Sequence, residues 1–183
     1  MFIQTEPTPN PATLKFLPGR DVLGQGTADF RAPNAAKISP LATRLFAIEG
    51  VKGVFLGSDF ITVTKADTME WPHLKPAILG SIMEHFLAGG PVMEGEDAGS
   101  ESTLAGADDP VAAQIRELID TRVRPAVAQD GGDIVFRGFE NGIVFLHMRG
   151  ACSGCPSSTA TLRHGIENML RHYVPSVVEV RPV

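Results

Sequence analysis

An acidic, polar stretch over residues 91–109 divides this 183-residue chain into two parts. It holds six acids and no bases, and it has almost no large apolar side chains. Such a stretch cannot bury enough apolar surface to offset the entropy lost on ordering. Residues 1–90 carry eight acids and eight bases, and residues 110–183 carry seven acids and eight bases. The sequence therefore predicts two nearly neutral folded domains, 1–90 and 110–183, joined by a flexible acidic linker over 91–109.

The first domain is expected to mix strands and helices. Proline at residue 40 after a capping serine, Ser39, predicts a helix start. An apolar stripe at helical spacing, ended by Gly89, predicts a second helix; it consists of Leu74, Ile78, Ile82 and Phe86. Four strands are expected, over residues 2–6, 13–17, 51–56 and 60–64. The domain has no cysteine and two histidines, so no metal site is expected from it alone.

The sequence of the second domain predicts the order helix, strand, strand, helix, strand. Asp109 and Pro110 begin the first helix, and Pro125 is expected to kink or end it. Strands over 134–137 and 143–148 are joined by Asn141-Gly142, a strong signal for a tight hairpin. The remaining elements are a helix whose apolar stripe runs from Leu162 to Tyr173 and a strand over 177–180. The fold class is thus α+β, with two small sandwich domains.

Composition excludes several classes of protein. No apolar run is long enough to cross a bilayer, and no secretory signal is visible at the amino terminus. A net charge of −5 and a pI near 5.5 argue against a nucleic-acid partner. The chain has two cysteines, three positions apart, so it is not a disulfide scaffold. This concentration of thiols indicates site chemistry in a reducing compartment.

The two cysteines lie in the segment C-S-G-C-P, between a strand and a helix. Pro156 is a natural first helical residue, which places Cys155 at or near the N-cap. The positive end of a helix favours thiolate over thiol. Gly150 and Gly154 allow a tight turn, so that the sulfurs of Cys152 and Cys155 can face one point. This spacing is the usual way to present two thiolates to one metal centre.

Three roles compete for this pair. Incidental structural cysteines are disfavoured because a glycine-flanked loop is a poor place to bury them. A dithiol redox site would normally follow the first strand of a larger βαβ unit. A metal site needs more than two ligands, from histidine or from a second chain. His147 is more simply a structural histidine, and His164 and His172 lie too far along the last helix. A symmetric dimer fits better, since four thiolates are the normal complement of a 4Fe–4S cluster.

Two other features near the loop are given structural roles. Asp130-Gly131-Gly132-Asp133 could suggest a metal or phosphate site, but glycines between aspartates before a strand are more often a turn that needs positive φ. Arg149 is the base nearest to the cysteines. It could offset the charge of a cluster, but a solvated surface arginine is the simpler expectation.

Three motifs resemble the NifU-like (Nfu) family of iron–sulfur scaffold and carrier proteins. Two of them lie in the second domain: V-R-P-A-V-A-Q-D-G-G-D, residues 123–133, and G-A-C-S-G-C-P-S-S-T-A-T-L, residues 150–162. In the first domain, residues 2–19, F-I-Q-T-E-P-T-P-N-P-A-T-L-K-F-L-P-G, resemble the start of the family's amino-terminal domain.

The resemblance implies a non-enzymatic carrier. Its cargo is a 4Fe–4S cluster that bridges Cys152 and Cys155 of two chains in a cluster-dependent homodimer. Implied partners are upstream cluster-assembly proteins and apo iron–sulfur acceptors, with no nucleic acid and no membrane. The expected location is a bacterial cytoplasm, or the mitochondrial matrix if a transit peptide precedes this sequence. The alternative function is a thiol–disulfide oxidoreductase using the same pair.

Overall fold

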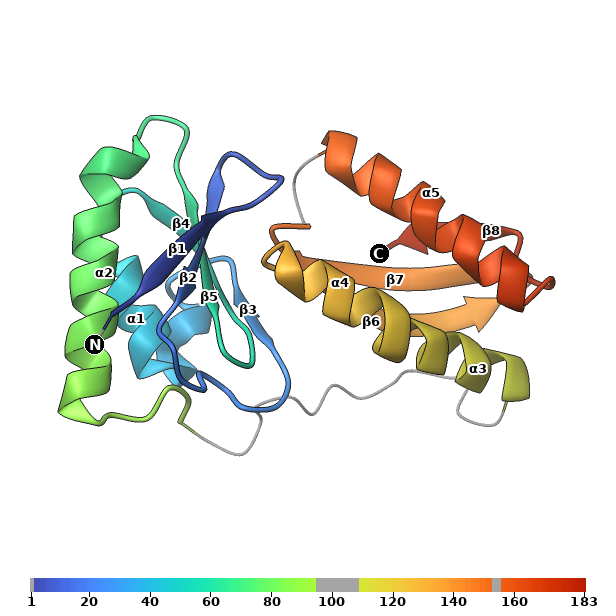
Figure 1. Cartoon of the computed structure of the whole chain (residues 1–183), viewed down its shortest axis with the longest axis horizontal. Coiled ribbons are helices and arrows are strands. Elements are labelled where there is room, and N and C mark those ends of the chain that lie inside the picture. The colour runs from blue at the N-terminus through green and yellow to red at the C-terminus, as the bar shows by residue number, and fades with distance from the viewer. Residues whose placement is uncertain (1, 95–108, 153–155) are drawn as a thin grey trace. The chain divides into compact units, whose positions relative to one another are not determined.

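The computed structural model describes residues 2–94, 109–152 and 156–183 (Figure 1). The chain separates into two compact units, Met1–Ser100 and Glu101–Val183. Each unit combines helices with one sheet, which confirms the predicted α+β class with two domains. Most of the predicted linker, residues 95–108, lies outside the described residues.

The first unit is built on a five-stranded antiparallel sheet in the order β1-β2-β5-β4-β3. Its strands are β1 (Gln4–Pro7), β2 (Thr13–Leu17), β3 (Ala28–Phe30), β4 (Val51–Leu56) and β5 (Ile61–Lys65). The sequence predicted β2 and β4 with these bounds, and it predicted β1 and β5 within two residues. It missed β3, because three residues are too few to show the alternating pattern of a strand.

Two helices, α1 (Pro40–Phe46) and α2 (Trp71–Ala88), pack together beside this sheet, after a short 3₁₀ turn, η1 (Ala35–Ile38) (Figure 1). As predicted, Ser39 caps α1: its Oγ accepts the N–H of Ala42 at 3.1 Å. Gly89, at φ 71°, ends α2. Fully buried side chains from the sheet and both helices form the core of this unit, among them Phe16, Leu41, Leu45, Ile61 and Ile78.

The first residues of the predicted linker belong structurally to the first unit. The N–H of Glu94 donates to the carbonyl of Ile38 at 2.6 Å. Ser39 Oγ donates to the carbonyl of Val92 at 2.5 Å. Val92 and Met93 pack against the core. Composition alone could not predict that residues 92–94 pack on the first unit, because two apolar side chains are enough to anchor such a short segment.

In the second unit the helices α3–α4 and α5 lie on one face of a three-stranded sheet, β6-β7-β8 (Figure 1). The strand β7 pairs with β6 antiparallel and with β8 parallel, so α5 forms the crossover. Asn141 and Gly142, at φ 51° and 79°, make the predicted tight turn between β6 and β7. The elements are α3 (Pro110–Leu118), a π-helical turn η2 (Ile119–Val123), α4 (Arg124–Gln129), β6 (Gly132–Glu140), β7 (Ile143–Gly150), α5 (Pro156–Tyr173) and β8 (Glu179–Pro182).

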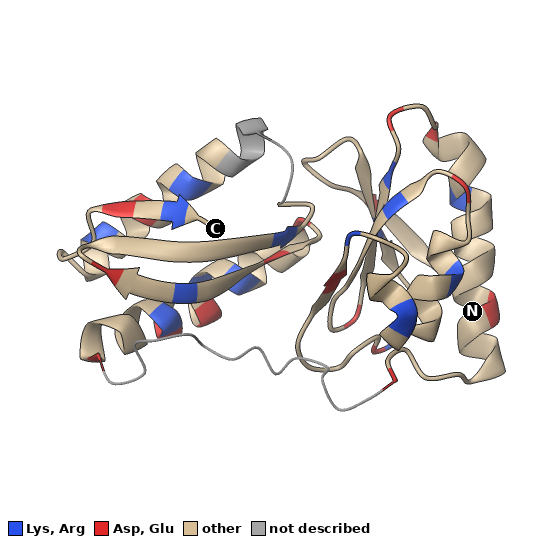
Figure 2. Cartoon of the chain, turned by 180° about the vertical axis from the view of Figure 1, so that it is seen from behind, with Lys and Arg blue, Asp and Glu red and all other residues tan. Residues whose placement is uncertain are grey.

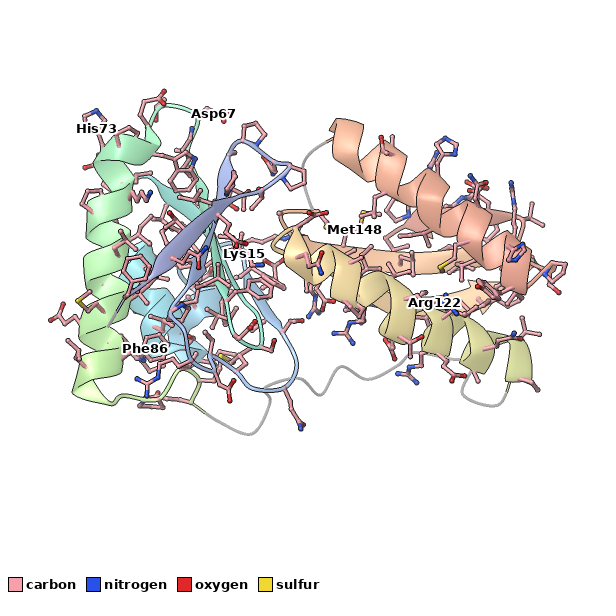
Figure 3. The ribbon with its side chains drawn as sticks, in the orientation of Figure 1. Lys15, Asp67, His73, Phe86, Arg122 and Met148 are labelled. Atoms are coloured by element: carbon pink, nitrogen blue, oxygen red, sulfur yellow. The ribbon has the colours of Figure 1, made fainter. Side chains whose placement is uncertain are left out.

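Pro125 was expected to kink or end the first helix of this unit. The helix α3 ends at Leu118, the π-helical turn follows, and Pro125 is the second residue of α4, so the helical path continues past it. A widened turn accommodates a residue that has no N–H to donate and whose ring crowds the preceding turn. The helix α5 ends at Tyr173, the last residue of the predicted apolar stripe. The Tyr173 side chain is 41% exposed, and its ring lies 4.9 Å from the guanidinium of Arg122, labelled in Figure 3. The last strand begins two residues later than predicted.

Candidate functional site

Cys152 lies just past the end of β7, in a short turn that bends back over the start of β6. Gly150 adopts φ 62°, which glycine allows without strain. The N–H of Ala151 then donates to the carbonyl of Gly131 at 3.2 Å. Met148, labelled in Figure 3, lies in the buried core of the unit. The predicted partner of Cys152 in the site, Cys155, lies outside the described residues, and Pro156 begins α5 as predicted.

The sulfur of Cys152 rests directly against Gly132. A Cβ added to Gly132 would lie 2.5 Å from the Cys152 Sγ and 2.9 Å from the carbonyl oxygen of Arg149. Gly132 is also the register partner of Gly150, so two glycines face each other at the end of the β6–β7 ladder. Because neither glycine has a side chain, the turn that contains Cys152 can pack closely against the sheet.

This packing buries Cys152, contrary to the expectation from sequence. The residue is 7% exposed and belongs to the core cluster of the second unit. The expectation failed because the glycines flanking the loop were taken as a sign of an open loop. In the structure, glycine on the opposite strand provides the space into which the sulfur packs.

Burial changes the acidity of this thiol. The pKa of Cys152 is raised from 9.0 to about 12, first by burial and then by the negative charges of Asp130 and Asp133. At neutral pH its thiolate fraction is therefore about a thousandfold lower than that of an ordinary thiol. The thiolate-favouring effect of a helix N-terminus was predicted for Cys155, outside the described residues. Cys152 itself is held as a thiol when nothing is bound to it.

We expect this acidity to be measurable in cluster-free protein. In a Cys155→Ala background, iodoacetamide should alkylate Cys152 slowly below pH 9, with a rate still rising above pH 10. Because the folded state binds the thiol proton more tightly, this group's contribution to stability is present below pH 9 and is lost as the pH rises toward 12. Asp130→Asn should move the alkylation profile to lower pH. A profile with its midpoint near pH 8.5 would contradict the account.

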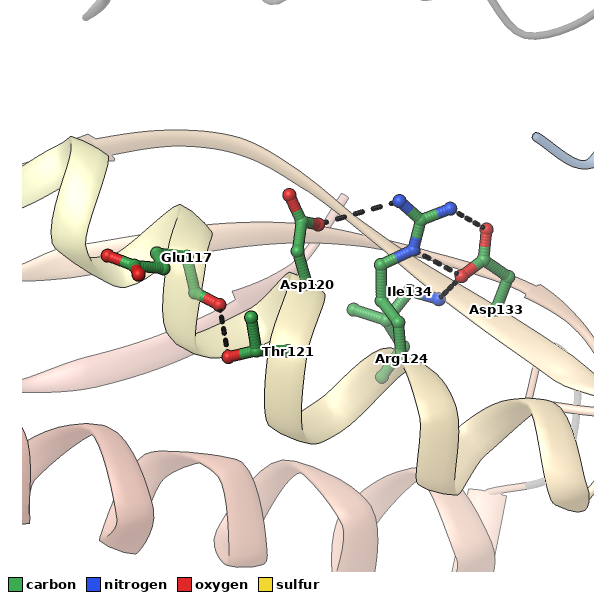
Figure 4. A network of polar contacts seen from close by, with 6 residues as sticks. All are labelled: Glu117, Asp120, Thr121, Arg124, Asp133 and Ile134. Atoms are coloured by element: carbon green, nitrogen blue, oxygen red, sulfur yellow. Dashed lines mark hydrogen bonds and ion pairs between the residues drawn. The ribbon is translucent and has the colours of Figure 1, made fainter. Parts of the chain in front are cut away.

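The Asp130–Asp133 segment serves as a turn and as the first residues of β6. Gly131 adopts φ 79°, as predicted for a turn between aspartates. Asp133, however, is only 3% exposed, and its two carboxylate oxygens accept from the Nε and Nη2 of Arg124, each at 2.9 Å (Figure 4). Its Oδ1 also accepts the N–H of Ile134 at 2.9 Å. The carboxylate is engaged by the protein's own donors, which supports the structural interpretation over a metal site.

Arg124 was missed by sequence reasoning, and Arg149 was misjudged. Arg149 is 8% exposed, so the expectation of a solvated surface arginine is wrong. It stands directly across the ladder from Asp133, which makes this end of the sheet a place where charged residues are enclosed. The sequence held only a weak signal for the Arg124–Asp133 pair. A buried aspartate requires a cationic or N–H partner, but no spacing along the chain identifies Arg124 as that partner. Elsewhere in this unit acidic and basic residues are interspersed (Figure 2).

The histidines do not gather around the cysteine. His147 Nδ1 lies 2.8 Å from the carbonyl of Val183, as suits a structural histidine, and His164 and His172 are exposed. In the first unit His85 is buried, and its pKa is lowered by burial and by Arg44. Within the part of the chain that the structure describes, no three His, Cys, Asp or Glu residues form a metal-binding group. No helix there is long and apolar enough to cross a membrane.

Both halves of the chain match known protein families. Residues 3–89 match the family described as scaffold protein Nfu/NifU N terminal. Residues 115–181 match the NifU-like domain, a range that includes Cys152 and Cys155. The two domains follow one another in the order that the sequence motifs predicted.

Alignments over the whole of this chain agree with these matches, and the chain spans about two thirds of the length of the relatives it matches. The chain is 52% identical over 184 residues to a Drosophila virilis protein and 53% identical over 188 residues to a human one, each named NFU1 iron-sulfur cluster scaffold homolog, mitochondrial. Both alignments cover all of this chain, with 62% of the fly protein and 72% of the human protein. A solution structure of a NifU-like protein from Saccharomyces cerevisiae is 29% identical and covers 52% of this chain and 86% of its own, with a TM-score of 0.47.

The names of these relatives are consistent with the mitochondrial alternative for location and give no support to the bacterial cytoplasm. They describe scaffolds for iron–sulfur clusters, in agreement with the function implied by the sequence motifs. With both domain types in order and more than half of its residues shared with the human protein, the chain belongs to the Nfu/NifU family of iron–sulfur cluster scaffold proteins.

Proposed function

We propose that this protein carries a 4Fe–4S cluster as cargo on Cys152 and Cys155 of two chains and passes it to apo iron–sulfur proteins. The observation that supports this most is the position of Cys152. It lies within the range that matches the NifU-like domain, and its sulfur packs against Gly132 at the end of the sheet. A thiol held at the end of a strand is a preorganised ligand. Cys155 enters the proposal through its spacing in the sequence.

The number of ligands requires a second chain. Each chain has two cysteines, whereas a cubane cluster normally takes four thiolates. A two-fold axis through the site supplies the other two with no further residues. Such a dimer forms with the cluster and dissociates without it, and this is what a protein that gives its cargo away requires.

The raised pKa of Cys152 gives cluster uptake a proton cost. A cysteine binds iron as thiolate, so loading must release the proton that Cys152 holds at neutral pH. Loss of the cluster would return this proton to Cys152.

The same observation weakens the alternative of a thiol–disulfide oxidoreductase. Disulfide exchange requires an accessible thiolate whose pKa lies near ambient pH. Cys152 is buried and its pKa lies near 12. As the attacking thiol it would be present almost entirely in its unreactive form.

Two assays separate these functions. After anaerobic reconstitution with iron and sulfide, the carrier should absorb broadly near 400 nm and transfer iron to an apo acceptor within minutes. It should also fail to reduce insulin disulfides catalytically in the presence of dithiothreitol. Catalytic insulin reduction without retained iron would overturn the proposal in favour of the redox function.

A further inference from the structure

The Arg124–Asp133 pair joins the helical layer of the second unit to the start of β6. Arg124 contributes two parallel hydrogen bonds to a carboxylate whose side chain is 5% exposed. The planar fork of a guanidinium matches a carboxylate in this way, which a lysine cannot do. With the additional bond from the N–H of Ile134, both position and orientation of the Asp133 carboxylate are fixed.

Asp133 immediately follows the residue on which the cysteine rests. The Cys152 sulfur packs against Gly132, and the carbonyl of Gly131 accepts the N–H of Ala151 at 3.2 Å. Gly131 and Gly132 therefore support Ala151 and Cys152 through a hydrogen bond and a packing contact. A displacement at the start of β6 would be transmitted to the thiol.

The π-helical turn η2 directs Arg124 toward this strand. The N–H of Arg124 donates to the carbonyl of Ile119, five residues back, rather than to the residue four back. Such widened turns are rare in proteins, and those that occur often lie at functional sites. The Arg124 guanidinium lies between the carboxylates of Asp120 and Asp133, and its Nη1 is 3.5 Å from the Asp120 Oδ1 (Figure 4).

We propose that Arg124 is a positioning residue for Cys152: through Asp133 it holds the start of β6 as the surface on which the ligand sulfur is seated. Cys152 matters as a ligand only within the function proposed above, so the inference rests on that function. The positioning itself is a property of the cluster-free chain and can be tested without any cluster.

The test uses the full chain with Cys155→Ala, which leaves Cys152 as its single thiol. Arg124→Lys keeps the positive charge and removes the paired hydrogen bonds. The matched control is Arg171→Lys, because Arg171 pairs at 2.9 Å with Glu167, another enclosed carboxylate of the same unit, on α5. Circular dichroism at pH 9 first establishes that both variants are folded, and alkylation of Cys152 by iodoacetamide is then followed at the same pH. Arg124→Lys should accelerate alkylation by about tenfold or more, since a charged hydrogen bond to the supporting strand is lost.

The control should leave the alkylation rate within about twofold of the parent, because it weakens the unit at a distance from the thiol. Equal acceleration in both variants would overturn the proposal and assign Arg124 to general stability; no acceleration in either would overturn it as well. If Arg124→Lys does not fold, the double change Arg124→Gln and Asp133→Asn replaces it, since it buries no unpaired charge. This change also removes the Asp133 charge that raises the pKa of Cys152, so its alkylation rate is compared with that of Asp130→Asn, which removes a like charge and leaves the Arg124–Asp133 pair intact. Alkylation no faster than in Asp130→Asn would overturn the proposal. A protein that fails to bind iron yet shows the Arg124 effect would refute the carrier function and retain this inference.

Discussion

Replacing Cys152 or Cys155 by alanine should reduce the iron bound after anaerobic reconstitution to near zero. The chain has no other thiol, so either change leaves two chains with two cysteines between them, half the number that a 4Fe–4S cluster normally takes. Cys152→Ala removes one small buried group and should cost about 1 kcal/mol of folding stability. Iron, sulfide and the free energy of unfolding should be measured on the same preparations.

His164→Ala is the suitable control for this pair of variants. His164 is exposed on α5 and was considered as a ligand only from sequence. Its removal should leave iron content unchanged. Full iron occupancy in Cys152→Ala, or loss of iron in His164→Ala, would show that the ligands have been wrongly assigned.

Gly132→Ala should damage the site more than its small size suggests. The added methyl would stand 2.5 Å from the Cys152 sulfur and 2.9 Å from a backbone oxygen, so either the strand or the cysteine turn must move. Overpacking of this kind typically costs about 1–3 kcal/mol. We expect that loss in urea unfolding of the second unit, together with strongly reduced iron binding.

Gly165→Ala provides the opposite case within the same unit. Gly165 lies in α5, and a Cβ there would meet no atom within 4 Å. Alanine in a helix interior is favoured over glycine by about 1 kcal/mol, so this variant should be more stable and should bind iron normally. If Gly132→Ala were as stable as the parent and kept its iron, the close contact between Gly132 and Cys152 would not be important for the site.

Local sequence signals were sufficient to predict helix starts and turns, where one or two residues determine the backbone conformation. Ser39 with Pro40 and Asp109 with Pro110 fixed two helix starts, and Asn141-Gly142 fixed the hairpin of the second sheet. Each such residue acts through its own hydrogen bond or dihedral angle. The division into two nearly neutral domains followed from charge and composition in the same way, and its boundaries remain a prediction.

The surroundings of Cys152 could not be predicted because they depend on contacts across the sheet. Burial of its sulfur depends on Gly132 in the facing strand, and the charge near it depends on Asp133. Asp133 in turn depends on Arg124, which a π-helical turn directs toward it. No spacing along the chain encodes such contacts. The sequence identified the chemical groups of the site, and the fold determined their acidity and support.

Native mass spectrometry of anaerobically reconstituted protein, with iron and sulfide counted on the same sample, tests the central claim most directly. The account predicts two chains with one 4Fe–4S cluster, and single chains once the cluster has been removed by chelator. A single chain that holds a complete cluster would contradict it, as would a dimer whose mass shows no iron or sulfide.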